Sequence, residues 1–433
     1  MKHGGDAAAR TASTFLGATG LESRAVGAGI SQLYAASTGT PGPPPLPLAT
    51  IFHTFGIAAL DLSPQDIHRV SASGPEILGV VPNEILTIPE PELRQARLRG
   101  SFSAARPPAP RDSDRGDIAS KYESKLEDIS KRSGRLRRHM ARTTPGTVSE
   151  SAMTWPLEMI GLSSRTQLTG HDVGLCVIDT GLDLDHPDFS GRVATDDAKS
   201  FVGGSVQDIR GHGTHCAGSA AGPASTAHGQ RYGVACDSRL LVAKVFSDSN
   251  DGASTSDILA AMEWGYHRGA RILSMSLGSE RDPGDPVSAT YERVASILLN
   301  EGVLVVAAAG NESRRSSGHI AAVGSPAACQ SVLAVAAVEQ DGAVSDFSCG
   351  AVDDIGDLGL AAPGGNILSS VPGGGYDALS GTSMACPHVA GLAALYMQAH
   401  PSASATDIQQ LMINSAESRS PHRDFGHGLA KAP

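Results

Sequence analysis

The sequence predicts an α/β fold in which a mainly parallel central sheet is covered by helices on both faces. From about residue 151 onward, short runs of continuous apolar residues alternate with longer runs of helical periodicity. The apolar runs show no polar alternation, which indicates strands buried on both faces, as in parallel sheets. Gly269 and Gly302 directly follow two of the helical runs, where helix C-caps are expected.

Each element follows from its own residues. Five apolar runs have the length of buried strands: residues 173–179, 240–246, 271–277, 303–309 and 332–338. Four longer runs are predicted to be helices: residues 255–269, 286–302, 383–400 and 405–416. Since functional residues of such sheets gather at the carboxyl ends of the strands, that edge is where a site is expected.

Composition divides the 433 residues into four regions. Residues 1–47 are rich in Ala, Gly, Ser and Thr, end in a proline-rich run, and are predicted to be a low-complexity leader. Residues 48–90 are predicted to form a small strand–helix–strand unit, with Ser63 as the helix N-cap. Residues 91–150 are rich in Arg and Lys between Pro, Ser and Asp, which predicts a flexible basic linker. Residues 151–433 form the main domain.

Bulk properties exclude several classes of protein. The net charge of −11 argues against nucleic-acid binding, and no apolar run reaches the length of a membrane span. The N-terminus lacks the continuous apolar stretch of a secretory signal, so none is predicted.

The six cysteines form no C-x-x-C pair, which argues against a zinc site. Cys176, Cys216 and Cys386 lie in apolar strand or helix runs and are predicted to be buried thiols. Cys329 and Cys349 lie in predicted loops, where pairing is an open alternative.

Three polar residues stand where chemistry is expected. Asp179 closes the strand "LCVID", His212 lies between two glycines in "GHGTH", and Ser383 begins the helix of "SGTSMACPH". Each has a structural alternative: a turn carboxylate, a histidine bonded to a loop carbonyl, and a helix cap. Together they have the chemistry of a triad, in which a carboxylate orients an imidazole that takes the proton from a hydroxyl nucleophile.

Three motifs in order, "VIDTGLDLDHPDF", "GHGTHCAG" and "SGTSMACPHVAG", resemble those of subtilisin-like serine proteases. In its cysteine, Cys216, the second motif resembles the form found in the proteinase K branch of the family. The resemblance implies a subtilisin-like three-layer α/β fold for residues 151–433. It also implies that Asp179 orients His212, that His212 is the general base, and that Ser383 is the nucleophile. Asn311, in "AAAGNES", matches the family's side-chain donor to the oxyanion.

The resemblance also implies substrate contacts. In the family, the edge of one strand pairs with an extended peptide substrate. The residues that match this edge are Ser276, Leu277 and Gly278. The pocket for the residue before the cleaved bond (the P1 residue) would have Ala309 and Gly310 in one wall and Gly324 at its floor. The implied partners are a protein or peptide substrate and no nucleic acid, and the implied state is a monomer.

No cofactor is implied for the chemistry, whereas a structural calcium ion is. Its ligands would be Glu339 and the carbonyl groups of Pro326 and Ala328.

Residues 48–90 resemble the family's inhibitory propeptide, of the inhibitor I9 type. This predicts a zymogen whose propeptide is an intramolecular inhibitor, with autocleavage after the basic cluster of the linker or near Pro89–Pro91.

Three functions follow. The first is a serine endopeptidase, the second a dedicated intracellular maturation protease for one partner, and the third an inactive peptide-binding homologue. The family favours an extracellular location, while the lack of a recognisable signal leaves an intracellular one open.

Overall fold

The computed structural model describes residues 22–27, 30–34, 49–52, 54–55, 57–60, 84–88, 153–163, 166–250 and 252–433. These residues all belong to one structural unit, which combines Met1–Glu92 with Ala152–Pro433. The predicted basic linker, residues 91–150, lies outside the described residues.

The main domain is built on a seven-stranded sheet whose neighbouring strands all run parallel. Its order is β13-β12-β11-β10-β6-β8-β7. The strands are β6 (Gly174–Asp179), β7 (Ala198–Ser200), β8 (Arg239–Lys244), β10 (Ala270–Met275), β11 (Leu304–Ala308), β12 (Val332–Val338) and β13 (Leu360–Pro363). The five predicted strands are confirmed, with ends shifted by at most two residues.

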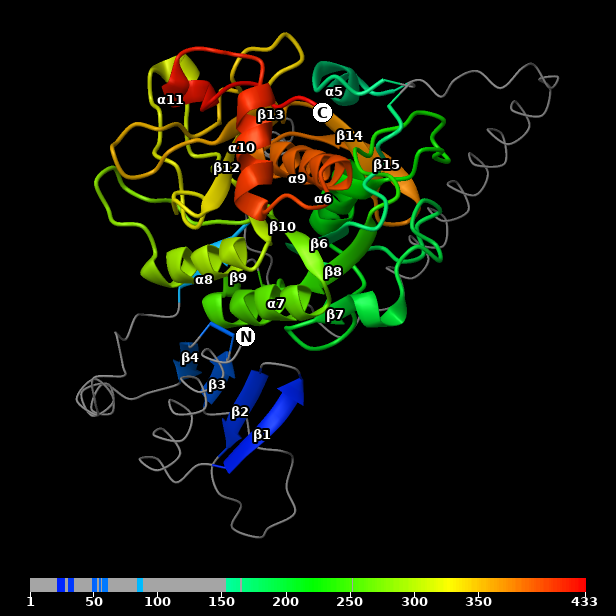
Figure 1. Ribbon diagram of the computed structural model, residues 1–433, viewed down its shortest axis with the longest axis vertical. Coiled ribbons are helices and arrows are strands. Elements are labelled where there is room, and N and C mark those ends of the chain that lie inside the picture. Colours follow the sequence, from blue (N-terminus) through cyan, green and yellow to red (C-terminus); the bar gives the residue numbers. More distant parts are fainter. Residues whose placement is uncertain are drawn as a thin grey trace, which may run out of the picture. The chain divides into compact units, whose positions relative to one another are not determined.

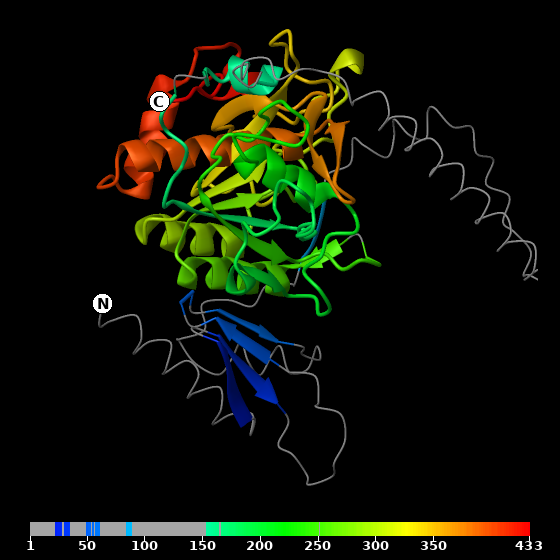
Figure 2. The same cartoon turned by 90° about the vertical axis from the view of Figure 1, so that its right-hand side faces the viewer.

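Helices cover both faces of this sheet (Figures 1 and 2). The longer ones are α6 (His212–Ala221), α7 (Thr255–His267), α8 (Ala289–Asn300), α9 (Thr382–Ala399) and α10 (Ala405–Ser415). Shorter elements are α5 (Trp155–Met159), α11 (His422–Phe425), and the 3₁₀ turns η1 (Thr195–Asp197) and η2 (Arg315–Ser317). The four predicted helices are confirmed, and Gly269 and Gly302 follow α7 and α8 with φ of 85° each.

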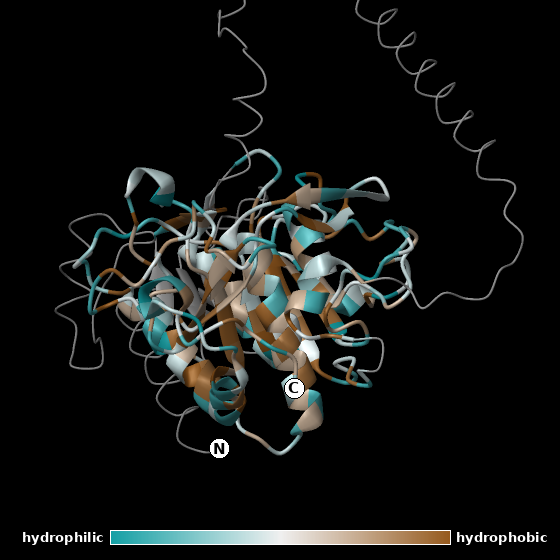
Figure 3. Ribbon diagram, turned by 90° about the horizontal axis from the view of Figure 1, so that it is seen from above, coloured by the Kyte–Doolittle hydropathy of each residue, from teal (hydrophilic) through white to brown (hydrophobic). Residues whose placement is uncertain are grey.

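Two cores lie on the two sides of the sheet, because successive strand residues point to opposite faces. In β6, Cys176 and Ile178 belong to the core shared with α7 and α8, whereas Leu175 and Val177 belong to the core shared with α6 and α9. Strongly hydrophobic segments, drawn in brown, include the central strands and parts of the helices that pack on them (Figure 3). The structure is therefore the predicted three-layer α/β arrangement.

A separate antiparallel sheet lies near the N-terminus, in the order β1-β2-β3-β4. Its strands are β1 (Glu22–Gly27), β2 (Ile30–Tyr34), β3 (Ala49–Phe52) and β4 (Ile57–Leu60). The predicted boundary at residue 47 is therefore wrong, because β1 and β2 lie within the predicted leader and pair with each other and with β3. Their sequences, ESRAVG and ISQLY, are short and mix polar with apolar residues, so the hydrophobic pattern did not reveal them. The helix predicted to start at Ser63 falls outside the described residues.

This N-terminal sheet contacts the main domain through the turn after β3. The Thr54 amide donates to Glu263 Oε1 of α7 at 2.8 Å, and Arg293 Nε of α8 donates to the Phe55 carbonyl at 3.2 Å. Phe52 and Phe55 are fully buried in the core that includes α7 and α8.

Two further strand pairs complete the structure: β14 (Ile367–Val371) with β15 (Gly375–Leu379), and β5 (Ile85–Thr87) with β9 (Gly252–Ser254). All six cysteines are buried free thiols, so Cys329 and Cys349 do not pair. Among the described helices, none combines the length and apolar character needed to cross a bilayer.

Candidate active site

Asp179 is the last residue of β6, near the centre of the parallel sheet. Its side chain is buried, and Oδ1 accepts a hydrogen bond from the amide of Thr180 at 2.7 Å. The carbonyl of Asp179 accepts from the amide of Val245 on the neighbouring chain segment. The carboxylate is therefore fixed at the carboxyl edge of the sheet, where the predicted site lies.

His212 is the first residue of α6, and two local features fix its position. Gly211, the N-cap, adopts φ of 92°, which a glycine tolerates without strain. The Asp208 carboxylate accepts hydrogen bonds from the amides of Gly211 and Thr214, both at 2.9 Å. These bonds satisfy donors at the start of the helix, which otherwise lack partners.

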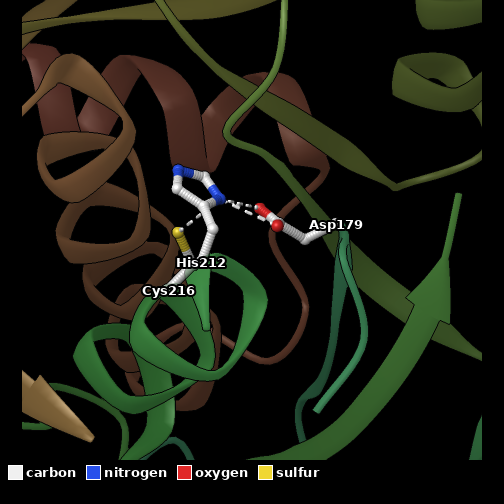
Figure 4. A group of neighbouring side chains, drawn as sticks. All are labelled: Asp179, His212 and Cys216. Atoms are coloured by element: carbon white, nitrogen blue, oxygen red, sulfur yellow. Dashed lines mark hydrogen bonds and ion pairs between the residues drawn. The ribbon is translucent and has the colours of Figure 1, made fainter. Parts of the chain in front are cut away.

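Close packing brings this helix start against the turn after Asp179. A Cβ atom at Gly213 would lie 2.3 Å from the Gly181 carbonyl oxygen, so any larger residue would separate the two segments. His212 Nδ1 lies 2.8 Å from Asp179 Oδ1 and 3.0 Å from Oδ2, as shown in Figure 4. The structure therefore joins the predicted acid and base.

Ser383 is the second residue of α9, so its amide is one of those left without an intrahelical acceptor. Its hydroxyl donates to the Ser276 carbonyl at 3.4 Å, while the Ser276 hydroxyl donates to the Ser383 carbonyl at 2.8 Å. Within the described part of the chain, the buried Nε2 atom of His212 has no hydrogen-bond partner.

Cys216 lies one turn after His212 and connects the two helices. Its sulfur is 3.8 Å from His212 Nδ1 and 3.4 Å from the Ser383 carbonyl oxygen, to which it donates. The sulfur and the imidazole are drawn together in Figure 4. The Cys216 sulfur thus contacts both His212 of the Asp179–His212 pair and the backbone of Ser383, whose hydroxyl is turned toward Ser276.

Burial and charge act in opposite directions on His212. Burial alone lowers the pKa of the imidazole, but the adjacent Asp179 carboxylate outweighs it, and the pKa lies well above its ordinary value. His215 and His388 are buried without such a partner, and burial lowers their pKa values to about 3 and about 4. Their rings contact the carbonyls of Ile367 and Met384 at 2.8 Å, as expected for neutral structural histidines.

Asn311 follows β11 and contacts the residue before Ser383. Its Oδ1 atom accepts two hydrogen bonds from Thr382, one from the amide and one from the hydroxyl, both at 2.9 Å. These bonds orient the amide group at the N-terminus of α9, as a donor to an oxyanion requires.

The predicted peptide-binding edge is paired with a segment of this same chain. Gly278 and Thr87 exchange two backbone hydrogen bonds of 2.8 Å in an antiparallel bridge. On its other side the segment pairs with β9, in the register Thr87 with Gly252. Residues 85–87 therefore pair with β9 on one side, and on the other side Thr87 pairs with Gly278 at the end of the edge formed by Ser276, Leu277 and Gly278.

The predicted P1 pocket residues also lie together. The Gly324 amide donates to the Ala309 carbonyl at 2.9 Å, and the Gly310 amide donates to the Thr382 hydroxyl at 3.2 Å. Wall and floor are thus joined to each other and to the start of the helix that carries Ser383.

Comparison with known proteins decides the family. Residues 170–428 match the family model of the subtilase family. The chain belongs to the subtilase family.

This subtilase is similar to several characterised proteins. It is 39% identical over 267 residues to Subtilisin Savinase of Lederbergia lenta, covering 61% of this chain and 91% of that protein. It shows the same identity over the same length to an alkaline protease of Alkalihalobacillus alcalophilus, covering 64% of that protein, just under two thirds. A solved cold adapted subtilisin-like serine proteinase superposes with a TM-score of 0.53 at 29% identity, covering 65% of this chain and 97% of that one. The subtilisin-like fold is confirmed.

The predicted calcium ligands of the subtilase are not brought together. Pro326 and Ala328 precede β12 and Glu339 follows it, so the seven-residue strand separates them by roughly 20 Å. The Glu339 carboxylate lies instead against Gly365, at the opposite end of the strand. The predicted site is therefore wrong, since one ion cannot reach both ends of the strand.

Three residues of the site escaped sequence analysis. Asp208 caps α6, Thr382 orients Asn311, and Lys244, which is buried, donates to the Thr180 carbonyl at 2.7 Å. The N-cap preference does not identify Asp208, because it stands three residues before the N-cap, Gly211. The contacts of Thr382 and Lys244 are long-range, and no local pattern predicts them.

Proposed function

We propose that this subtilase is a serine endopeptidase acting through Asp179, His212 and Ser383. The observation that carries this proposal is the buried Asp179–His212 hydrogen bond, which the Cys216 sulfur links to the backbone of Ser383 at a helix N-terminus. A carboxylate bonded to Nδ1 fixes the tautomer in which Nε2 can accept a proton.

In the proposed reaction, the Ser383 hydroxyl turns from Ser276 toward His212 Nε2. Its proton passes to Nε2 while Oγ attacks the substrate carbonyl carbon, whose oxygen becomes an oxyanion. The Ser383 amide and the Asn311 side-chain NH₂ group would donate to that oxyanion. In subtilisin, loss of the corresponding asparagine lowers kcat by a factor of about 10²–10³.

Collapse of the tetrahedral species breaks the C–N bond, and His212 returns the proton to the leaving amine. This leaves an acyl-enzyme on Ser383. Water, deprotonated by His212, then attacks the ester and restores the hydroxyl and the free acid. All proton transfers run between these side chains, the substrate and water.

We also propose that the chain is a zymogen inhibited by its own N-terminal region. The support is the antiparallel pairing of Thr87 with Gly278, which is how an extended substrate would bind. The carbonyl of Ser276, which stands two residues before Gly278, contacts Ser383 Oγ, so the cleaved bond is expected about two residues beyond Thr87 in the sequence. Cleavage is therefore proposed between Pro89 and Glu90, within the range expected from the sequence.

Ser383→Ala tests the proposal. The purified variant should remain full-length, whereas the wild-type chain should yield an N-terminus at Glu90 and react with a fluorophosphonate at Ser383. Cleavage of the pure variant would contradict self-processing, and a processed wild type without labelling would favour an inactive peptide-binding homologue. The family favours an extracellular site of action. A peptide-library profile restricted to one sequence would instead support a dedicated maturation protease.

A further inference from the structure

Arg281 lies three residues beyond Gly278, in the loop that continues the peptide-binding edge. Its side chain is only 4% exposed, although it carries a charge. Nη1 and Nη2 donate to the two carboxylate oxygens of Asp353 at 2.8 and 3.0 Å. Such a paired contact fixes both distance and orientation.

The other contacts of the Arg281 guanidinium are with backbone carbonyls of two segments. Nε donates to Val323 at 3.0 Å, and Nη1 donates to Asp285 at 2.8 Å and to Asp282 at 3.4 Å. One buried side chain therefore joins its own loop to the segment before Gly324 and to Asp353.

The bond to Val323 lies next to the floor of the P1 pocket. On the other side of Gly324, Ser325 exchanges two backbone hydrogen bonds with Ser279, of 2.9 and 3.0 Å. Gly324 is thus held between the Arg281 contact and the Ser279–Ser325 bridge. Gly278, which pairs with Thr87, directly precedes Ser279, so both substrate contacts belong to one bonded framework.

Asp353 anchors this framework from the other side. Besides Arg281, it accepts from the amides of Gly284, Ile355 and Gly356 at 2.9, 3.2 and 3.0 Å. A Cβ atom at Gly356 would lie 2.6 Å from Arg281 Nη2, so the loop packs directly on the guanidinium. The hydrogen bonds from Arg281 hold the pKa of Asp353 far below its usual range, so the carboxylate is ionised wherever the enzyme would work.

We propose that Arg281 and Asp353 are positioning residues that fix the spacing between the edge Ser276–Gly278 and the pocket floor at Gly324. They determine how well a peptide binds, and they leave the chemistry at Ser383 unchanged. This inference rests on the proposed endopeptidase function.

The test compares enzymes activated by self-cleavage from full-length chains that carry Asp353→Asn, Arg281→Lys, or Arg281→Met together with Asp353→Asn. KM for a tetrapeptide substrate should rise by about ten-fold or more, because small displacements of a binding framework are costly, while kcat stays within about two-fold. Arg281→Lys should recover only part of the loss, since an ammonium group lacks the paired geometry. The double variant removes both charges, which avoids the unfolding that an unpaired buried charge can cause.

The matched control is Asp197→Asn. Asp197 is a buried carboxylate that accepts two bonds from Arg239, at 2.8 and 2.6 Å, in the segment before β7. Its loss should lower thermal stability and leave KM unchanged. The fluorophosphonate labelling rate of Ser383 should be unchanged in all variants.

An unchanged KM in the folded Asp353 and Arg281 variants would overturn the inference. Equal losses of kcat and of the labelling rate would also overturn it, because they would show that Arg281 and Asp353 position the catalytic groups. A wild-type chain that neither hydrolyses peptides nor labels at Ser383 would instead refute the proposed function itself.

Discussion

Thr87 and Gly278 exchange two backbone hydrogen bonds of 2.8 Å across 191 residues of sequence. Glycine is required at this edge, because a Cβ atom at Gly278 would lie 2.7 Å from the Ser325 carbonyl oxygen. The bridge places a piece of the N-terminal region along the edge that the family uses for peptides, and it links the propeptide-like region directly to the proposed site.

Leu86 should be the residue that holds this segment in place. Its side chain is fully buried in the core that also contains Leu277, whereas the neighbouring Ile85 is 58% exposed. Leu86→Ala should weaken docking of the segment by about 2–5 kcal/mol, the usual cost of truncating a buried leucine. The lag before proteolytic activity appears should shorten. Ile85→Ala is the control, and an equal lag in both variants would contradict this role of Leu86.

The acid limb of activity should be shifted upward relative to that of an isolated histidine. His212 must be neutral to accept the Ser383 proton, and the adjacent Asp179 carboxylate raises the pKa of its imidazole well above 6.5. The acid limb of kcat should therefore lie above pH 6.5, higher than the near-neutral value that an isolated histidine predicts. A kcat profile under conditions where chemistry limits the rate would measure this, and a limb below pH 6 would refute it.

Docking of the N-terminal sheet should weaken as the pH rises. Burial raises the pKa of Glu263 from its ordinary 4.5 to about 7. Among the described residues of the N-terminal region, only Thr54 donates a hydrogen bond to Glu263. A carboxyl with a raised pKa in the docked state favours docking at low pH, and this advantage is lost between about pH 4.5 and 7. His267, whose ring contacts the Thr54 hydroxyl, is the neighbouring titratable group.

The measurement is the release of the cleaved N-terminal region from the enzyme, followed by gel filtration between pH 5 and 8. Glu263→Gln should flatten the pH dependence, and His267→Gln should leave most of it intact. A Glu263→Gln protein with the wild-type profile would assign the effect to another group.

Asp208 should affect catalysis through the position of His212. Asp208→Ala removes the bonds to Gly211 and Thr214 at the start of α6 and should cost about 1–3 kcal/mol of stability. Because His212 is the first residue of that helix, kcat should also fall while KM changes little. Asp407→Ala removes the bonds that the Asp407 carboxylate accepts from Ser404 in the capping box of α10, and it should lower stability alone. Equal kcat values for the two variants would exclude this role.

Much of this protein follows from local sequence. The continuous apolar runs determined the parallel strands, since a strand buried on both faces is built mainly of apolar residues. The glycines after α7 and α8 marked the helix ends, because positive φ is strained in other residues. The three motifs identified Asp179, His212 and Ser383 as candidates, because each motif is local and carries its own backbone geometry.

Other features depend on contacts between distant segments, which no local pattern encodes. The predicted calcium ligands are not brought together, because the strand at residues 332–338, which the sequence itself predicts, lies between Ala328 and Glu339. The strands β1 and β2 were missed because pairing with β3, and not their own composition, stabilises them. The sequence by itself determined which side chains could do the chemistry. Tertiary packing alone decided that the start of α6 packs closely against the turn after Asp179, which the lack of a side chain at Gly213 allows. It also decided that Arg281 bonds Asp353 and that Thr87 pairs with the peptide-binding edge.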